Sequence, residues 1–312
     1  MTRILITGAA GAVGQALLAE LDGTDHAVIA TDIRQPPNLA PGVEWQPLDV
    51  TTDAPTRVIG EAKPEAVIHL ASIVTPPKDS TRTFEHAVDV EGSRKVLDAC
   101  IEAGVRRLVV TSSGAAYGYH ADNPVPLSET DPVRGNAEFA YSDHKRQVEE
   151  MLAAARASHP ELEQVVLRVG TVLGAGLENQ ITALFRRPRL IAVSGSESPF
   201  VFIWTRDLAR ILLRAATDGP PGIFNVAGDG AMGVTDIAGA LGKLVLRLPA
   251  GLLKATLGIA RPLGLSRYGP EQVRFLQYRP VLDNTALKEV FGYTPELTSR
   301  DVFDLWRKAA GL

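Results

Sequence analysis

The first fourteen residues place a glycine-rich turn between an apolar strand pattern and a helical pattern. Residues 3–14 read RILITGAAGAVG. Gly8 allows a tight turn, Gly11 lets another group approach the backbone, and Gly14 lets the helix pack closely on the strand. A small-residue turn of no special role is the alternative interpretation. The strand–turn–helix order instead favours a parallel β-α-β unit whose helix start binds a pyrophosphate, and so predicts a dinucleotide site.

Short β-branched runs alternate with helical patterns along most of the chain. We expect strands at residues 4–7, 27–31, 43–48, 66–70, 108–112, 165–168 and 223–226, and helices at 13–21, 88–103, 141–157 and 207–217. This alternation predicts an α/β fold, a Rossmann-type doubly wound parallel sheet of about seven strands. Residues 1–168 are expected to form the dinucleotide-binding domain. Glycine and proline become frequent afterwards, so residues 169–312 are expected to form mainly a small, irregular substrate cap, with segments near 200–228 rejoining the sheet.

The composition is that of a globular enzyme. The chain has 312 residues, of which 45% are hydrophobic and 22% charged, and a formal net charge of -4. The acidic balance gives no electrostatic case for a nucleic-acid partner. Cys100 is the single cysteine, so no disulfide forms within the chain, and the six histidines show no metal-ligand spacing. With neither a leader nor a run of about 18 apolar residues, we expect a cytoplasmic protein without a membrane partner.

A carboxylate follows the second strand pattern. Asp32 lies 24 residues after Gly8, where it accepts hydrogen bonds from ribose hydroxyls and repels a 2′-phosphate. NAD is therefore expected rather than NADP, with Arg34 softening the preference. Asp49 follows the third strand pattern and is expected either to accept from the adenine amino group or to be a solvated turn aspartate. The same loops place further residues beside the cofactor, namely Ala12, Val13, Ile33 and Val50.

Three side chains form a candidate catalytic group. Tyr141 and Lys145 are four residues apart in a helical pattern and share one face. A phenol has a pKa of about 10, and a nearby ammonium and a positive nicotinamide ring both favour its phenolate. Ser113 ends the fifth strand pattern, where its hydroxyl polarises a substrate oxygen. A tyrosine–lysine pair alone is common on amphipathic helices. Together with the glycine turn, the set predicts hydride transfer between a nicotinamide and a carbon bearing oxygen, with tyrosine as acid/base.

These residues resemble a known family, the extended short-chain dehydrogenases/reductases of the NAD-dependent epimerase/dehydratase kind. The resemblance rests on TGAAGAVG at 7–14, Asp32, HLAS at 69–72, DVEGSRKVLDAC at 89–100, TSSGAAYG at 111–118, YSDHK at 141–145 and FIWTRDLAR at 202–210. It implies catalytic roles for Ser113, Tyr141 and Lys145, and a cofactor lined by Leu70, Ala71 and Ser72. It also implies a homodimer through helices near residues 89–103 and 141–157.

Four positions depart from the pattern of the sugar-nucleotide epimerases, and one dipeptide departs from that of the dehydratases. Phe200 stands where an arginine grips the substrate diphosphate, and Val169 and Thr171 replace a proline and an asparagine. Asp89 stands where an asparagine is usual. Gly114 begins the Gly-Ala dipeptide that replaces the Asp-Glu pair of the dehydratases. These differences weaken the case for a UDP-sugar and argue against dehydration.

The substrate therefore stays open at this point. Expected substrate contacts are Ser72, Ser113, Thr171 and Asn179, although Asn179 fits a helix start better. A sugar epimerase that retains its NAD is one hypothesis. A second is a dehydrogenase of a sugar acid, a polyol or an apolar ring alcohol such as a steroid, because the apolar segment 244–265 would suit a greasy pocket, cap core or dimer contact. A non-catalytic NAD-sensing protein is the third.

Overall fold

A computed structural model describes residues 1–77, 79–264 and 269–312. Its centre is a seven-stranded sheet in the order β10-β6-β5-β4-β1-β2-β3, and every pair in it is parallel. The strands are β1 (Arg3–Thr7), β2 (Ala27–Asp32), β3 (Glu44–Pro47), β4 (Ala66–His69), β5 (Arg107–Ser113), β6 (Glu163–Val169) and β10 (Gly222–Val226). The predicted fold class is thereby confirmed.

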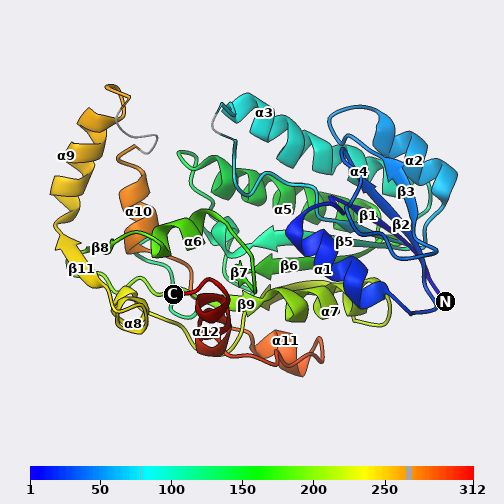
Figure 1. Ribbon diagram of the computed structural model, residues 1–312. Helices are drawn as coiled ribbons and strands as arrows, with labels where there is room; N and C mark the ends of the chain where they lie inside the picture. Colours follow the sequence, from blue (N-terminus) through cyan, green and yellow to red (C-terminus); the bar gives the residue numbers. More distant parts are fainter. Residues whose placement is uncertain (78, 265–268) are drawn as a thin grey trace.

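Helices cover both faces of this sheet (Figure 1). One apolar cluster packs α1 (Ala12–Leu21) and α7 (Thr205–Ala216) on the first face, and a second packs α2 (Ala54–Ala62), α4 (Gly92–Glu102) and α5 (Ala140–Ser158) on the other. The strands are buried on both sides, which is why they read as continuous apolar runs in the sequence. Parallel strands end at the same edge, so the loops after β1, β2, β4 and β5 meet there.

One predicted helix differs from expectation. Residues 88–103 do not form a continuous α-helix: a π-helical turn η1 (Ala87–Glu91) precedes α4 and follows the short α3 (Arg82–His86). A π-turn inserts an extra residue into the helical ladder and re-aims the side chains on it. Here it directs Asp89 into the protein, where the side chain is buried.

The remaining elements form the cap. Two small parallel pairs, β7 (Thr171–Leu173) with β9 (Phe202–Trp204) and β8 (Arg189–Val193) with β11 (Leu244–Leu248), lie outside the central sheet. Its helices are α6 (Gln180–Phe185), α8 (Val234–Ala240), α9 (Ala250–Ala260), α10 (Gln272–Gln277) and α12 (Ser299–Ala309), whereas α11 (Thr285–Glu289) packs against β10 of the central sheet. An aromatic cluster made by Phe185, Phe200, Phe202, Phe303 and Trp306 forms its core. Residue 265, the end of the predicted apolar segment, lies outside the described residues.

Candidate active site

The glycine turn fits a pyrophosphate. Gly8 has a φ of 72°, and a Cβ there would lie 2.7 Å from the Ala71 nitrogen. A Cβ on Gly14 would lie 2.6 Å from the Gly8 carbonyl oxygen. Gly11 begins α1 without a side-chain cap, and a Cβ on it would meet only the Gly8 oxygen, at 3.3 Å. The first N–H groups of α1 have no partner within the helix, so this uncapped, open side suits an anion.

Asp32 lies beside this turn at the end of β2. Its carboxylate accepts from the Ala10 N–H at 3.0 Å and from the Arg34 N–H at 3.2 Å. These bonds hold the carboxylate at the edge of the sheet next to the glycine turn. The neighbouring Ile33 side chain is 68% exposed, an open apolar surface of the kind that packs on an adenosine.

In the loop after β3, Asp49 and Val50 make contacts within the protein. Asp49 accepts from both the N–H and the hydroxyl of Thr51, at 2.9 and 2.7 Å, so it makes an Asx-type turn. Val50 is buried, and a Cβ on Gly92 would meet its methyl group at 2.7 Å. Contacts of Asp49 and Val50 with the adenine stay predictions.

Two polar bonds bring the start of α5 against the end of β5. After Ser113 the chain forms a short 3-10 turn, η2 (Gly114–Tyr117). The Ser142 hydroxyl donates to the Ala115 carbonyl at 2.7 Å and accepts from the Asn136 N–H at 3.1 Å. This clamp places the start of α5, with Tyr141, against the turn that follows Ser113.

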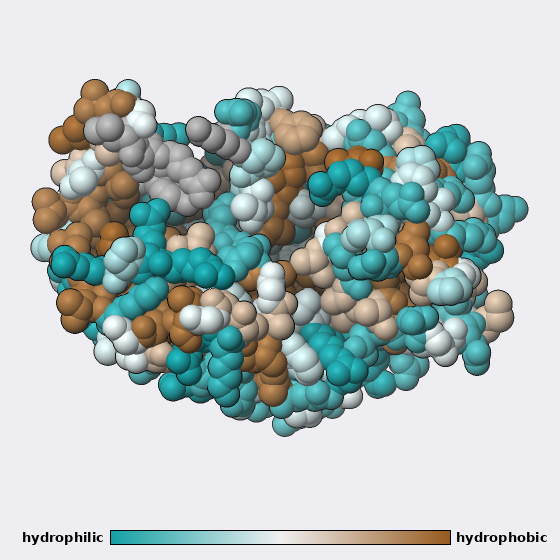
Figure 2. Space-filling model, viewed as in Figure 1, coloured by the Kyte–Doolittle hydropathy of each residue, from teal (hydrophilic) through white to brown (hydrophobic). Residues whose placement is uncertain are grey.

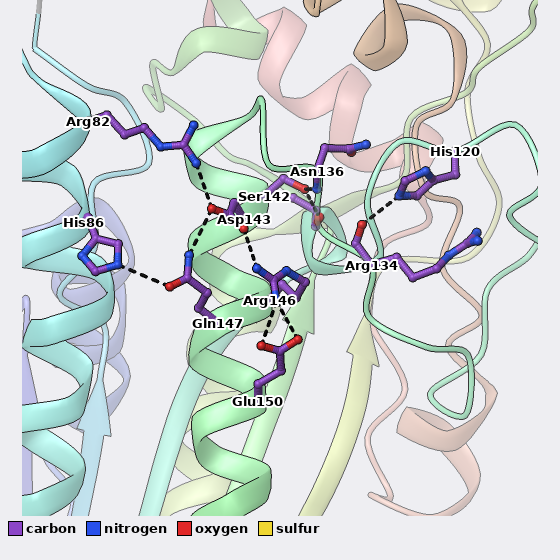
Figure 3. A network of polar contacts seen from close by, with 11 residues as sticks. Arg82, His86, His120, Arg134, Asn136, Ser142, Asp143, Arg146, Gln147 and Glu150 are labelled. Atoms are coloured by element: carbon purple, nitrogen blue, oxygen red, sulfur yellow. Dashed lines mark hydrogen bonds and ion pairs between the residues drawn. The ribbon is translucent and has the colours of Figure 1, made fainter.

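A charged cluster holds the outer side of the same helix turn (Figure 3). The buried Asp143 carboxylate pairs with Arg82 of α3 at 2.8 Å and with Arg146 of α5 at 2.7 Å. The Gln147 amide donates to it at 3.0 Å, and the Gln147 oxygen lies 3.3 Å from the His86 ring. The start of α5 is therefore fixed to α3 as well as to η2.

Lys145 lies one helical turn beyond Tyr141. Its ammonium donates to the Thr111 carbonyl at 2.9 Å and lies 5.6 Å from the centre of the Tyr141 ring. Burial lowers the pKa of Lys145, whereas the carboxylates of Asp89 and Glu149 act in the opposite direction.

The pKa of Tyr141 differs from the expectation that Lys145 lowers it. Burial raises this pKa to about 12, the hydrogen bond with Ser113 lowers it, and the Asp89 carboxylate raises it further. The physical reason is that the ammonium lies beside the ring and donates to the Thr111 carbonyl. The protein by itself thus keeps the phenol protonated at neutral pH.

Asp89 connects the cofactor loop with the catalytic helix. Its carboxylate accepts from the Ser72 hydroxyl at 2.9 Å, from the Ile73 N–H at 2.7 Å, and from Nδ1 of the buried His144 at 3.0 Å. Burial acts to raise the pKa of Asp89, but the bond from His144, the Lys145 ammonium and the other two bonds together hold it below its usual value. Sequence reasoning weighed the histidines only as metal ligands and so missed the pair of Asp89 and His144, which η1 brings together.

A hydrogen-bonded chain runs through His69 at the end of β4. The Ser93 hydroxyl donates to the Asp89 carbonyl at 2.6 Å and therefore accepts from Nε2 of His69 at 2.9 Å. Nδ1 of His69 is then an acceptor for the Thr7 hydroxyl at 2.7 Å. Burial lowers the pKa of His69 to about 3, and Lys145 adds to this, so the ring is neutral. The chain ties β1 and β4, which carry the cofactor loops, to η1 and α4.

A buried ion pair joins α5 to β6. Glu149 accepts from Arg168 of β6 through three N–H···O contacts of 2.7 to 3.1 Å. The Ser112 hydroxyl donates to the same carboxylate at 2.5 Å. Arg168 also donates to the Tyr117 hydroxyl at 2.8 Å. All four side chains are buried, so the pair fixes the position of α5 relative to β5 and β6.

The comparison with protein families identifies the class. The model of the NAD-dependent epimerase/dehydratase family matches residues 4–227. The chain belongs to this family. The matched range contains the glycine turn, Asp32, Ser113, Tyr141 and Lys145. As in the rest of this NAD-dependent family, NAD is the cofactor.

Relatives and solved structures agree with the family. An uncharacterised protein of Mycobacterium bovis is 24% identical over 316 residues, covering 99% of this chain and 84% of that protein. A UDP-glucose 4-epimerase of Azospirillum brasilense is 31% identical over 181 residues, covering 55% of this chain and 50% of the epimerase. MoeE5 in complex with UDP-glucuronic acid and NAD has a TM-score of 0.77 at 22% identity, with 99% of each chain covered. The Thermotoga maritima UDP-glucose 4-epimerase with UDP-glucose has a TM-score of 0.76 at 20% identity, covering 99% of this chain and 98% of that one. At these identities the two structures show the fold.

A buried arginine, Arg279, lies beside Phe200, the residue that stands where the sugar-nucleotide epimerases carry an arginine. Phe200 is buried in the cap core, and the Arg279 guanidinium lies 3.8 Å from the centre of its ring. Arg279 donates to the Ser198 carbonyl at 2.5 and 2.8 Å, and it forms no ion pair with a carboxylate of the described residues. Burial lowers the pKa of Arg279 to about 9, so it stays charged at neutral pH.

Tyr119 has both Tyr141 and Arg279 in its surroundings. Burial raises the pKa of Tyr119, the nearby Tyr141 adds to this, and Arg279 lowers it. Tyr119 packs edge-on against Phe275, over whose ring the Arg279 guanidinium also lies. Sequence reasoning missed Arg279 because it follows α10 in a segment without a motif.

Two of the expected substrate residues, Thr171 and Asn179, lie at the start of a strand and at the start of a helix. Thr171 begins β7 and is half-buried. Asn179 caps α6: its side-chain oxygen accepts from the N–H groups of Ile181 and Thr182, both at 2.9 Å, and its amide donates to the Val172 carbonyl at 3.1 Å. Its polar atoms are thus engaged in a helix cap. Substrate contacts by these residues stay predictions.

Proposed function

We propose that this family member is an oxidoreductase or epimerase acting on a secondary alcohol or ketone, with Tyr141 as acid/base. The observation that carries the proposal is that the start of α5, with Tyr141 and the buried Lys145, is bonded to the end of β5, which carries Ser113, at the carboxyl edge of the sheet. Bound NAD accepts or returns a hydride and places a positive charge near the phenol. The intact set argues against a purely sensing role.

Each residue has a distinct part in this scheme. Tyr141 takes the hydroxyl proton of the substrate as the C–H hydrogen leaves as hydride, and the alcohol becomes a ketone. Ser113 donates a hydrogen bond to the same oxygen. Because the protein alone raises the pKa of Tyr141 to about 12, the nicotinamide charge and a turn of Lys145 toward the phenol and ribose are needed to favour the phenolate.

We further propose that the substrate is a sugar derivative carrying a negative charge. A buried guanidinium without a carboxylate partner is costly unless an anion reaches it. Arg279 meets this description near Tyr119, which also has Tyr141 in its surroundings, and it supplies a cation that position 200 lacks. The structures of MoeE5 and of the Thermotoga epimerase hold UDP-sugars. A nucleoside diphosphate sugar is the first candidate, and epimerisation or simple oxidation both fit the same half-reaction.

A second candidate is a dehydrogenase of a non-nucleotide substrate, such as a sugar acid, a polyol or a steroid-like alcohol. Phe200 favours it, because a buried phenyl ring stands where the epimerases carry their diphosphate arginine. In that case Arg279 would bind a carboxylate of the substrate, or the substrate would be uncharged and would not use Arg279.

We also propose a homodimer through α4 and α5. A shallow depression lies between the outer faces of these helices. Its apolar floor is lined by Val90, Leu97, Ile101, Met151 and Ala154, with charged side chains around it. Light scattering coupled to gel filtration would give twice the chain mass, and Met151→Glu would reduce it to one.

The experiment that tests the function is a substrate panel on purified protein supplied with NAD. UDP-glucose, UDP-glucuronic acid, the free sugars, sugar acids and a steroid alcohol are each incubated, and both NADH absorbance and products are measured. Conversion of a UDP-sugar without net NADH supports an epimerase, and net NADH supports a dehydrogenase. Tyr141→Phe should lower either rate by about 10²-fold or more. An active enzyme whose rate is unchanged by that substitution would overturn the proposed role of Tyr141.

A further inference from the structure

An exposed apolar surface lies on the cap, away from the candidate active site. Six of the thirteen large apolar side chains that are exposed in the described residues belong to β8, β11, α9 and the turn after it. They are Ile191, Leu244, Leu246, Leu252, Ile259 and Leu263. Figure 2 shows apolar residues gathered along the edge that α9 and β11 form. Such a concentration on one part of a protein marks an interaction surface.

The outward position of these side chains follows from the packing of α9. Leu253 and Leu257 face inward and contact the apolar cluster around Val193 and Val273. Leu252 and Ile259, seven residues apart on the same helical stripe, are left 54% and 65% exposed. The inner face of α9 is thus packed against the cap. The second apolar stripe of the helix has no partner among the described residues.

The strand pair continues the surface. Leu246 is paired with Ile191 in the β8–β11 register, so the two side chains lie on the same face. Leu244 lies two residues before Leu246, on that face too, and is 71% exposed. The other side of β8, with Leu190 and Ala192, is buried in the cap.

The charged residues of the same region are all basic. We define the basic lobe as residues 186–193 and 243–264, which include β8, β11 and α9. It contains seven basic and no acidic residues, whereas the rest of the chain contains 25 basic and 36 acidic ones. The basic residues are Arg186, Arg187, Arg189, Lys243, Arg247, Lys254 and Arg261. Three of them pair with carboxylates outside the lobe, at Glu178, Glu197 and Glu271.

This combination of chemistries limits the occupant. A two-fold dimer through the lobe would bring the four basic residues that have no ion pair among the described residues close to the same four of the other copy, which disfavours a second copy. Nucleic acid would leave the leucine and isoleucine stripe without an apolar partner. An anionic bilayer surface satisfies both features, because apolar side chains enter the acyl boundary while lysine and arginine reach the headgroups. No helix among the described residues is long and apolar enough to cross a membrane, so the contact is a peripheral one.

We infer that the basic lobe docks this protein on an anionic phospholipid surface through the outer stripe of α9 and the β8–β11 face. This inference replaces the sequence-based expectation of no membrane partner, which rested on the lack of a leader and of a long apolar run. It does not depend on which substrate the candidate active site takes.

Vesicle flotation tests the inference. The full chain is mixed with phosphatidylcholine vesicles that either contain or lack phosphatidylglycerol, at low and high salt. We expect binding only to the anionic vesicles, weakened by salt. The variant Leu252→Asp/Ile259→Asp should bind about tenfold more weakly or worse, with an unchanged melting temperature because both side chains are exposed.

Val290→Asp is the matched control, since Val290 is 64% exposed on α11 outside the lobe. It should bind as the unmodified protein does, and Lys254→Glu should reduce binding to anionic vesicles. Absence of binding to anionic vesicles at low salt would overturn the inference, and so would equal binding by the double variant. Concentration-dependent self-association that the double variant abolishes, without vesicle binding, would identify a second copy as the occupant instead.

Discussion

Replacing Asp89 by asparagine removes one charged oxygen from a network in which Asp89 and His144 are buried. The carboxylate accepts three hydrogen bonds, from Ser72, Ile73 and His144. Asparagine keeps one acceptor oxygen and turns an NH₂ group toward a former donor, so one charge-assisted bond is lost. Such bonds contribute about 1.5–3 kcal/mol. We therefore expect the melting temperature to fall on the order of 5 °C, measured by circular dichroism at neutral pH.

The effect should depend on pH with a definite sign. The pKa of Asp89 is lower in the folded protein than its ordinary value, so its stabilising contribution is present above the unfolded pKa of about 4 and is lost as pH falls through the folded value. The difference in melting temperature between the protein and Asp89→Asn should thus be constant from about pH 6 to about pH 8, where Asp89 is ionised in both the folded and the unfolded state. It should shrink in acid. A difference that grows in acid would refute the reasoning.

The same substitution should change the pH profile of the proposed reaction. The Asp89 carboxylate raises the pKa of Tyr141. Without that negative charge the phenolate forms more readily, so substrate oxidation by Asp89→Asn should begin at a lower pH. Asp25→Asn, at an exposed aspartate before β2, is the matched control and should leave both the profile and the melting temperature unchanged.

Three further substitutions test other parts of the site. Gly14→Ala places a Cβ 2.6 Å from backbone atoms of the glycine turn, so NAD affinity measured by calorimetry should fall about tenfold or more, while Gly60→Ala, which meets open space, should not change it. Glu149→Ala leaves Arg168 buried without its partner and should cost about 3–5 kcal/mol in denaturant unfolding; a loss below about 1 kcal/mol would contradict the support assigned to this pair. Arg279→Met should raise KM for an anionic substrate about tenfold with kcat nearly unchanged, and an unchanged KM would show that the substrate does not reach it.

The sequence was sufficient for the central sheet because its signals are local. Each buried strand is a short apolar run, and its alternation with helical patterns indicates a parallel sheet with right-handed crossovers. The glycine turn and the strand-end position of Ser113 are local in the same sense. The predicted strand at residues 43–48 and the observed Glu44–Pro47 differ only at their ends, where hydrogen bonding rather than side-chain pattern decides.

What the sequence left open depends on contacts between distant segments. Asp89 and His144 are 55 residues apart, and only the π-turn brings them together. Arg279 lies 79 residues after Phe200, in an irregular part of the cap with no periodic pattern. The rise in the pKa of Tyr141 depends on burial and on where the Lys145 ammonium points, and neither is visible in the spacing of the two residues.

The measurement that tests the account most directly is the cofactor itself. Nucleotide released from the purified protein by acid is identified by chromatography, and binding of NAD and NADP to the emptied protein is compared by calorimetry. The account predicts NAD, bound about tenfold or more tighter than NADP, with the preference lost in Asp32→Ala. Equal or tighter binding of NADP, or no binding of either, would contradict the assignment of the glycine turn and Asp32 as the dinucleotide site.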